Sequence, residues 1–123
     1  HSLEHILSAY HPNLPHGAGL VLISRAYFGF FIERGLCAEK FVRIAKTLGF
    51  KEANEPKDFL VALEHLLQEC GVADLTMNQF GIKEDELPGF AQEVRTSLPL
   101  AFDCDPIDLT VKDCEEIYKR SFK

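Results

Sequence analysis

Residues 18–34 read AGLVLISRAYFGFFIER. If this stretch is helical, its hydrophobic side chains cover most of the circumference of the helix. Such a pattern predicts a central, buried helix. Pro15 and Gly17 separate it from the preceding segment, and Gly35 fits the left-handed position that often follows a helix. The hydrophobic positions are Leu20, Val21, Ile23, Tyr27, Phe28, Phe31 and Ile32.

Further helices are predicted on both sides of this stretch, because hydrophobic residues recur there at three- and four-residue spacing. The predicted helices span residues 1–10, 18–34, 38–48 and 56–70, a fifth lies within residues 84–97, and a last one starts at residue 110. Pro56 suits a first helical turn, and Thr110 with Asp113 resembles a capping box. No segment alternates as a strand does. We therefore predict an all-α bundle of five to six helices with short loops.

Length and composition indicate one soluble globular domain. The chain has 123 residues, of which 46% are hydrophobic and 26% are charged. Its net charge of −6 argues against nucleic acid as a partner. No hydrophobic run approaches the roughly 18 residues that a membrane span needs, so we expect no membrane partner either.

The start of the chain and the cysteines favour a cytoplasmic location. Residues 1–5 lack the basic and hydrophobic blocks of a secretory signal. Four cysteines occur at irregular spacing without a C-x-x-C pair, which gives no support to a zinc ribbon or a redox motif. Cys70 and Cys114 lie within helical patterns, and we expect both to be buried, reduced thiols.

Three histidines near the start are the candidates for chemistry. His1 and His5 are four residues apart, so on a helix they share one face, with their β-carbons about 6 Å apart. His16 lies in a Pro-His-Gly turn after a loop that is long enough to fold back over that face. Three converging imidazoles are able to bind Fe, Zn, Co or Ni, and an imidazole also moves protons near neutral pH. Spacing alone leaves open that they are incidental surface histidines. His11 and His65 are given no role.

The same residues resemble a known family. HSLEH at residues 1–5 and PHG at residues 15–17 resemble the H-x-x-x-H and P-H-G motifs of the iron-containing alcohol dehydrogenases. Residues 80–88 resemble that family's late segment with Gly-Ile, acidic residues and Leu-Pro. Residues 105–113 resemble its last helix. The resemblance covers essentially the whole chain in order.

The resemblance implies a fold and a set of site residues. Family members join an N-terminal α/β domain that binds NAD or NADP to a C-terminal, dehydroquinate synthase-like helical domain. Residues 1–123 resemble only the helical, metal-binding domain. The family holds Fe2+, sometimes replaced by Zn2+, with one Asp and three His. Two of these ligands carry over to His1 and His16, and His5 matches a histidine that lines the active site and acts in proton transfer. The other two ligands lie on a D-x-x-x-H segment that this chain lacks.

The implied activity is the interconversion of a small alcohol and an aldehyde. The metal acts as a Lewis acid on the substrate oxygen, and hydride passes between the substrate carbon and the nicotinamide. Because no Gly-rich phosphate-binding turn is present, we expect the chain alone to be inactive and the missing N-terminal domain to be its partner, with a homo-oligomer possible in the parent enzyme. The chain departs from the family at Glu4, where a small residue is usual. It departs again at Asp105-Pro106-Ile107, where Asn-Pro-Arg is usual.

Two alternatives remain at this point. One is a stand-alone helical interaction module whose histidines are incidental. The other is a copper site made by the terminal amine and His1, which ranks last because such enzymes are rich in β-structure. The metal hypothesis requires the rings of His1, His5 and His16 to lie together on one surface. An exposed hydrophobic patch beside them would further support the interpretation that the chain is a fragment whose surface faces a missing domain.

Overall fold

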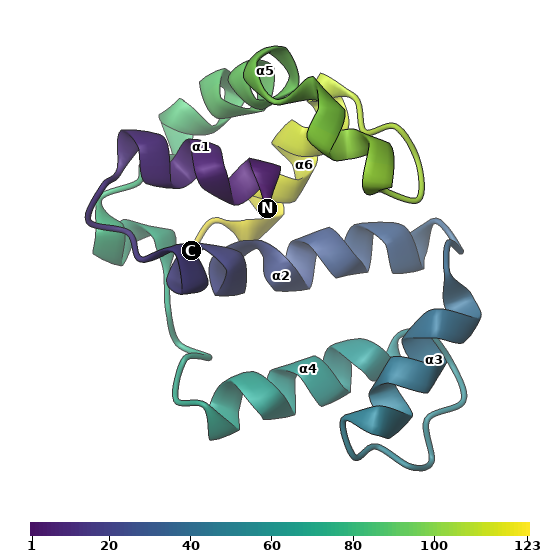
Figure 1. Ribbon diagram of the computed structural model, residues 1–123. Coiled ribbons are helices and arrows are strands. Elements are labelled where there is room, and N and C mark those ends of the chain that lie inside the picture. Colours follow the sequence, from purple (N-terminus) through teal and green to yellow (C-terminus); the bar gives the residue numbers. More distant parts are fainter. The chain divides into compact units, whose positions relative to one another are not determined.

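The computed structural model describes residues 1–99 and 102–123 with their side chains, and it confirms the all-α prediction. The described residues form no strand. Figure 1 shows the six α-helices in chain order: α1 (Ser2–Tyr10), α2 (His16–Glu33), α3 (Ala38–Thr47), α4 (Asp58–Glu69), α5 (Leu87–Ser97) and α6 (Val111–Ser121). Three short 3-10 helices complete the chain: η1 (Met77–Phe80), η2 (Glu84–Glu86) and η3 (Pro99–Cys104).

The chain divides into two compact units, and the first holds the candidate site. This unit consists of His1–Ala26 and Leu75–Lys123. Within it α1 packs against α5, and α5 packs against α6. The Tyr118 hydroxyl of α6 donates a hydrogen bond of 2.6 Å to the carbonyl of Leu3 in α1. Burial raises the pKa of Tyr118 far above its usual range, so the hydroxyl stays neutral and remains a donor.

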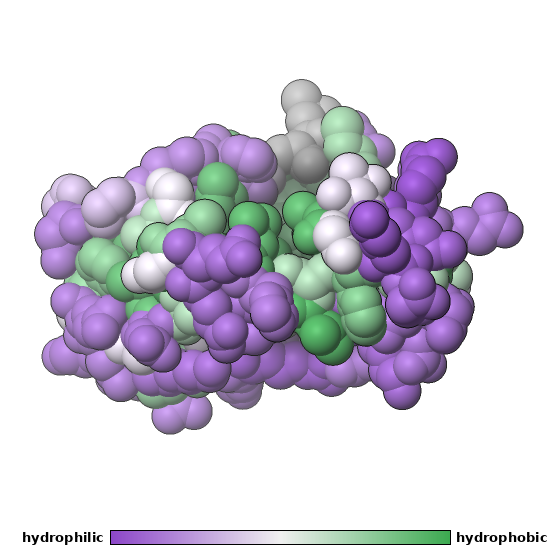
Figure 2. Space-filling view, turned by 90° about the horizontal axis from the view of Figure 1, so that it is seen from below, coloured by the Kyte–Doolittle hydropathy of each residue, from purple (hydrophilic) through white to green (hydrophobic). Residues whose placement is uncertain are grey.

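The second unit, Tyr27–Asp74, is organised by aromatic side chains and by the packing of α3 against α4. The ring of Phe28 lies 5.0 Å from that of Phe59, which in turn lies 5.2 Å from that of Phe41. Such tilted and edge-to-face contacts are the preferred arrangements of aromatic pairs. The face seen in Figure 2 shows hydrophobic side chains reaching the surface among hydrophilic ones.

The starts of α2 and α4 each differ from the prediction by two residues. Helix α2 begins at His16, two residues before the predicted start, because the Gly19 amide already donates to the carbonyl of Pro15 at 3.0 Å. Helix α4 begins at Asp58, so the prediction that Pro56 lies in its first turn was wrong. The Asp58 carboxylate accepts hydrogen bonds from the amides of residues 54 and 55 at 2.8 and 3.0 Å. These bonds hold the chain in a tight turn ahead of the helix, and they lower the pKa of Asp58.

The predicted cap of the last helix is confirmed. The Thr110 amide donates to the Asp113 carboxylate at 2.9 Å, and the Asp113 amide donates to the Thr110 hydroxyl at 3.2 Å. This reciprocal pair is a capping box, with Asp in place of the more usual Glu. It fixes the start of α6, the helix whose Tyr118 binds α1.

The two cysteines expected to be buried behave differently. Cys114 is buried in α6, and burial raises the pKa of its thiol to about 12. Cys70 is exposed, so that prediction was wrong. Cys70 is the C-cap residue of α4. The hydrophobic stripe of the helix reaches the surface there, because Leu66, one turn earlier, is exposed as well, at 38%. No helix within the described ranges is both long and hydrophobic enough to span a membrane.

Candidate metal centre

The structure brings the three predicted histidines together in the first unit. The ring centroid of His16 lies 5.3 Å from that of His1 and 5.4 Å from that of His5. His1 and His5 are 6.2 Å apart. Helix α1 places these two one turn apart, since the His5 amide donates to the carbonyl of His1 at 2.9 Å. His1, His5 and His16 are all exposed residues, so the cluster of three rings is accessible to solvent.

The loop between α1 and α2 sets the position of His16 at the first residue of α2. The loop begins at the C-cap of α1, where the His11 amide donates to the carbonyl of Leu7 at 2.9 Å. The Leu14 amide then donates to the carbonyl of His11 at 2.8 Å, and the Leu14 side chain is only 3% exposed. The chain thus turns back within five residues and brings His16 over the face of α1.

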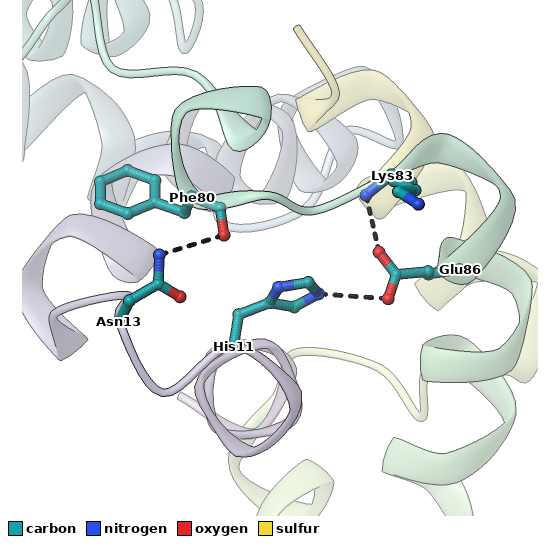
Figure 3. Close-up of polar contacts among 5 residues, drawn as sticks. All are labelled: His11, Asn13, Phe80, Lys83 and Glu86. Carbon is teal, nitrogen blue, oxygen red and sulfur yellow. Dashed lines mark hydrogen bonds and ion pairs between the residues drawn. The ribbon is translucent and has the colours of Figure 1, made fainter.

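Two side chains tie this loop to the segment around η2, as Figure 3 shows. Nε2 of His11 lies 3.2 Å from Oε1 of Glu86, whose other oxygen accepts the Lys83 amide at 2.7 Å. The Asn13 amide group donates to the carbonyl of Phe80 at 3.3 Å. Sequence reasoning gave His11 no role, but the structure makes it an anchor of the loop that carries His16.

Glu4 is the site residue that the sequence reasoning did not single out as functional. It lies between the two histidines of α1, yet it is fully buried, at 0% exposure. Its Oε1 accepts a hydrogen bond from the Ser8 hydroxyl, and its Oε2 is hydrogen-bonded to Nδ1 of His16. Potential ligand atoms of Glu4, His5 and His16 all lie within 4.8 Å of one another.

Gly19 in α2 makes room for this carboxylate. A β-carbon at residue 19 would lie 2.6 Å from Cγ of Glu4 and 2.7 Å from its Oε1. Real β-carbons do not approach other atoms so closely, so any other residue there would displace Glu4. Two features of the sequence could have indicated this buried carboxylate. One is a Glu and a Ser four residues apart on one helix, and the other is a glycine inside an otherwise bulky hydrophobic helix.

The residues fit part of a transition-metal site. Imidazole nitrogens and carboxylate oxygens are the usual ligands of Zn2+ and of non-haem Fe2+. The three rings converge from two helix termini, and a buried carboxylate lies behind one of them. The additional support that an exposed hydrophobic patch would give is absent: of the large hydrophobic residues that are exposed in the described part of the chain, only Tyr10 belongs to the unit that holds the histidines.

Comparison with known proteins gives this arrangement a family. A sequence profile described as "Fe-containing alcohol dehydrogenase family, C-terminal" matches residues 1–122. The chain belongs to the iron-containing alcohol dehydrogenase family. This match confirms the resemblance drawn from the motifs at residues 1–5 and 15–17. A search of curated proteins found no significant match.

Solved structures support the family's fold. Two structures of an archaeal halo-thermophilic alcohol dehydrogenase from a Red Sea brine pool match with TM-scores of 0.87 and 24% sequence identity. One is a histidine-to-alanine mutant and the other is bound to NZQ. The match covers 99% of this chain but only 32% of the archaeal enzyme. The chain therefore spans about a third of the length of these solved alcohol dehydrogenase structures. The individual roles of His1, His5 and His16 stay predictions.

Proposed function

We propose that this chain is the metal-binding helical domain of an NAD(P)-dependent alcohol dehydrogenase and that His1 and His16 are two of the metal ligands. One observation carries the proposal: the rings of His1, His5 and His16 lie within 5.3–6.2 Å of one another in a chain of this family. An interaction module with incidental histidines gives no reason for that convergence.

His1 and His16 would hold the metal through imidazole lone pairs. They come from the start of α1 and the start of α2, so the ring positions are fixed by two separate helices. The metal would be Fe2+ or Zn2+, and the remaining ligands would come from residues outside this chain. When bound, such a metal supplies Lewis-acid polarisation of the substrate oxygen.

His5 would move the proton. It is exposed and lies one helical turn from His1, so it can meet both a substrate above the site and bulk water. Imidazole accepts and releases protons near neutral pH. In this proposal His5 receives the proton that leaves the alcohol and passes it to solvent, and it returns a proton in the reverse direction.

The partners belong to the same proposal. The substrate is a small alcohol or aldehyde, and NAD or NADP is held mainly by an N-terminal nucleotide-binding domain. The helical domain contributes ligands, a proton carrier and one wall of the cleft. The proposal allows for a homo-oligomer of the parent enzyme.

Two measurements test this function. The gene region upstream of residue 1 should encode a D-x-x-x-H segment and a Gly-rich phosphate-binding turn. The complete polypeptide, loaded with Fe2+ and given NAD or NADP with a panel of alcohols, should turn over, whereas the chain alone should not. His16→Ala should abolish turnover, and His65→Ala on the exposed surface of α4 should not. Turnover by the chain alone, or by the His16→Ala variant, would refute the proposal.

A further inference from the structure

We propose that Glu4 is a positioning residue: its carboxylate holds Nδ1–H of His16 and so presents the other ring nitrogen, Nε2, to the metal. This inference rests on the proposed function, because it assumes that His16 binds a metal.

The first step concerns whether Glu4 is itself a ligand. Both of its oxygens already have partners, since Oε1 accepts from the Ser8 hydroxyl and Oε2 is bonded to Nδ1 of His16. The side chain is 0% exposed, whereas the His16 side chain is 50% exposed. The carboxylate therefore lies behind the imidazole, on the protein side, and His16 lies between Glu4 and solvent. A carboxylate in this position orients the metal ligand His16 and is not itself a ligand.

The second step concerns the tautomer of His16. An ionised carboxylate accepts hydrogen bonds and donates none. Its contact with Nδ1 therefore requires the proton of a neutral imidazole to be on Nδ1, which leaves the lone pair on Nε2. Metal-bound histidines generally donate their second nitrogen to a carboxylate or a carbonyl in this way, and this contact fixes both the tautomer and the orientation of the ring.

The third step is that the fold reserves space for this contact. Gly19 lies one turn after His16 on α2, and a β-carbon there would clash with Cγ and Oε1 of Glu4. Ser8 lies one turn after Glu4 on α1 and holds the second oxygen. The carboxylate is thus constrained from both helices, so its direction toward His16 is fixed. A charged group that only filled space would not need these contacts.

The chain offers a matched control. Glu115 on α6 lies in the same unit, and its carboxylate pairs with the Lys119 ammonium at 2.6 Å. Glu115→Gln removes a carboxylate that pairs with a lysine of its own helix, and Glu4→Gln removes the carboxylate that pairs with His16. Both variants preserve the shape of the side chain.

The first experiment measures the His16 tautomer without metal. In protein with 15N-labelled histidine, at a pH where imidazole is neutral, NMR should show the proton of His16 on Nδ1. The Glu4→Gln variant should shift that equilibrium toward the Nε2–H form, and Glu115→Gln should leave it unchanged. A wild-type His16 that carries its proton on Nε2 would overturn the inference, even if no variant folds.

The second experiment titrates Co2+ alone into the complete polypeptide, which would supply the remaining ligands, and into the same variants of it, and follows the absorption spectrum of Co2+. Glu4→Gln should weaken binding about 10-fold to 100-fold, as expected for loss of an orienting partner, while Glu115→Gln should match the wild type. If His16→Ala abolishes binding and Glu4→Gln does not weaken it, the inference is wrong and the proposed function survives. If the wild type binds no Co2+, or His16→Ala has no effect, the proposed function fails and the metal role of Glu4 fails with it.

Discussion

Gly19→Ala is the substitution whose effect follows most directly from the geometry of the site. The new β-carbon would lie 2.6 Å from Cγ, 2.7 Å from Oε1 and 3.0 Å from Cδ of Glu4. Glu4 has no easy escape, because it is fully buried and both oxygens are held by Ser8 and His16. We therefore expect the substitution to force Glu4 away from His16.

The magnitude combines two opposing effects. Overpacking a tight buried position costs about 1–3 kcal/mol, whereas replacing Gly by Ala inside a helix gains up to about 1 kcal/mol. The net destabilisation at residue 19 thus lies between about 0 and about 3 kcal/mol. Gly29→Ala in the same helix is the control, because its β-carbon would lie 3.9 Å from Cδ1 of Leu60, which is an ordinary contact. That variant should be as stable as the wild type or more so.

Urea unfolding followed by circular dichroism at 222 nm measures both variants. Gly19→Ala should unfold at lower urea than the wild type, and Gly29→Ala should not. Gly19→Ala should also weaken Co2+ binding, because Glu4 is displaced. If Gly19→Ala proves as stable as Gly29→Ala and binds Co2+ like the wild type, then the close packing of Glu4 against α2 is not real.

Three further predictions follow from individual contacts. Tyr118→Phe removes the hydrogen bond to the carbonyl of Leu3 and should lower the free energy of unfolding by about 1 kcal/mol. Urea titration measures this change, and an unchanged midpoint would show that the bond contributes nothing to stability. The exposed Cys70 should react with a thiol reagent in the native protein, whereas Cys114, buried and with a pKa of about 12, should react only after unfolding; equal rates would contradict its burial. The lowered pKa of Asp58 stabilises the folded state above its unfolded pKa of about 3.9, and this contribution is lost as pH falls through the lower folded value. Asp58→Ala should therefore be less stable than the wild type at pH 7 and nearly equal to it at pH 2, and a constant difference across that range would contradict this.

The helices could be predicted because their hydrophobic spacing and their breakers agree. Pro15 before α2 and Gly35 after it bracket a stretch that is hydrophobic on most sides, and few folds other than a helical core can bury such a segment. The exact starts could not be predicted. Whether α4 begins at Pro56 or Asp58 depends on hydrogen bonds from the Asp58 carboxylate to preceding amides, which the hydrophobic pattern does not record.

The candidate site could be predicted only in part. His1 and His5 share a face by helical geometry alone, and the Pro-His-Gly turn suggested that His16 returns to that face. Glu4 was missed as a functional residue because a glutamate between two exposed histidines is typical of a solvated helix face. Its burial depends on Gly19, fifteen residues away, and the loop that brings the two together has a path that local patterns do not determine.

A Zn2+ titration of the chain, followed through the NMR signals of its five histidine rings, tests whether three of these rings form one metal-binding cluster. Signals of His1, His5 and His16 should therefore change together at the same Zn2+ concentrations, while His65 on the surface of α4 should not respond. If His65 changes in parallel with them, or if His1 and His16 do not respond, the cluster is not a metal site.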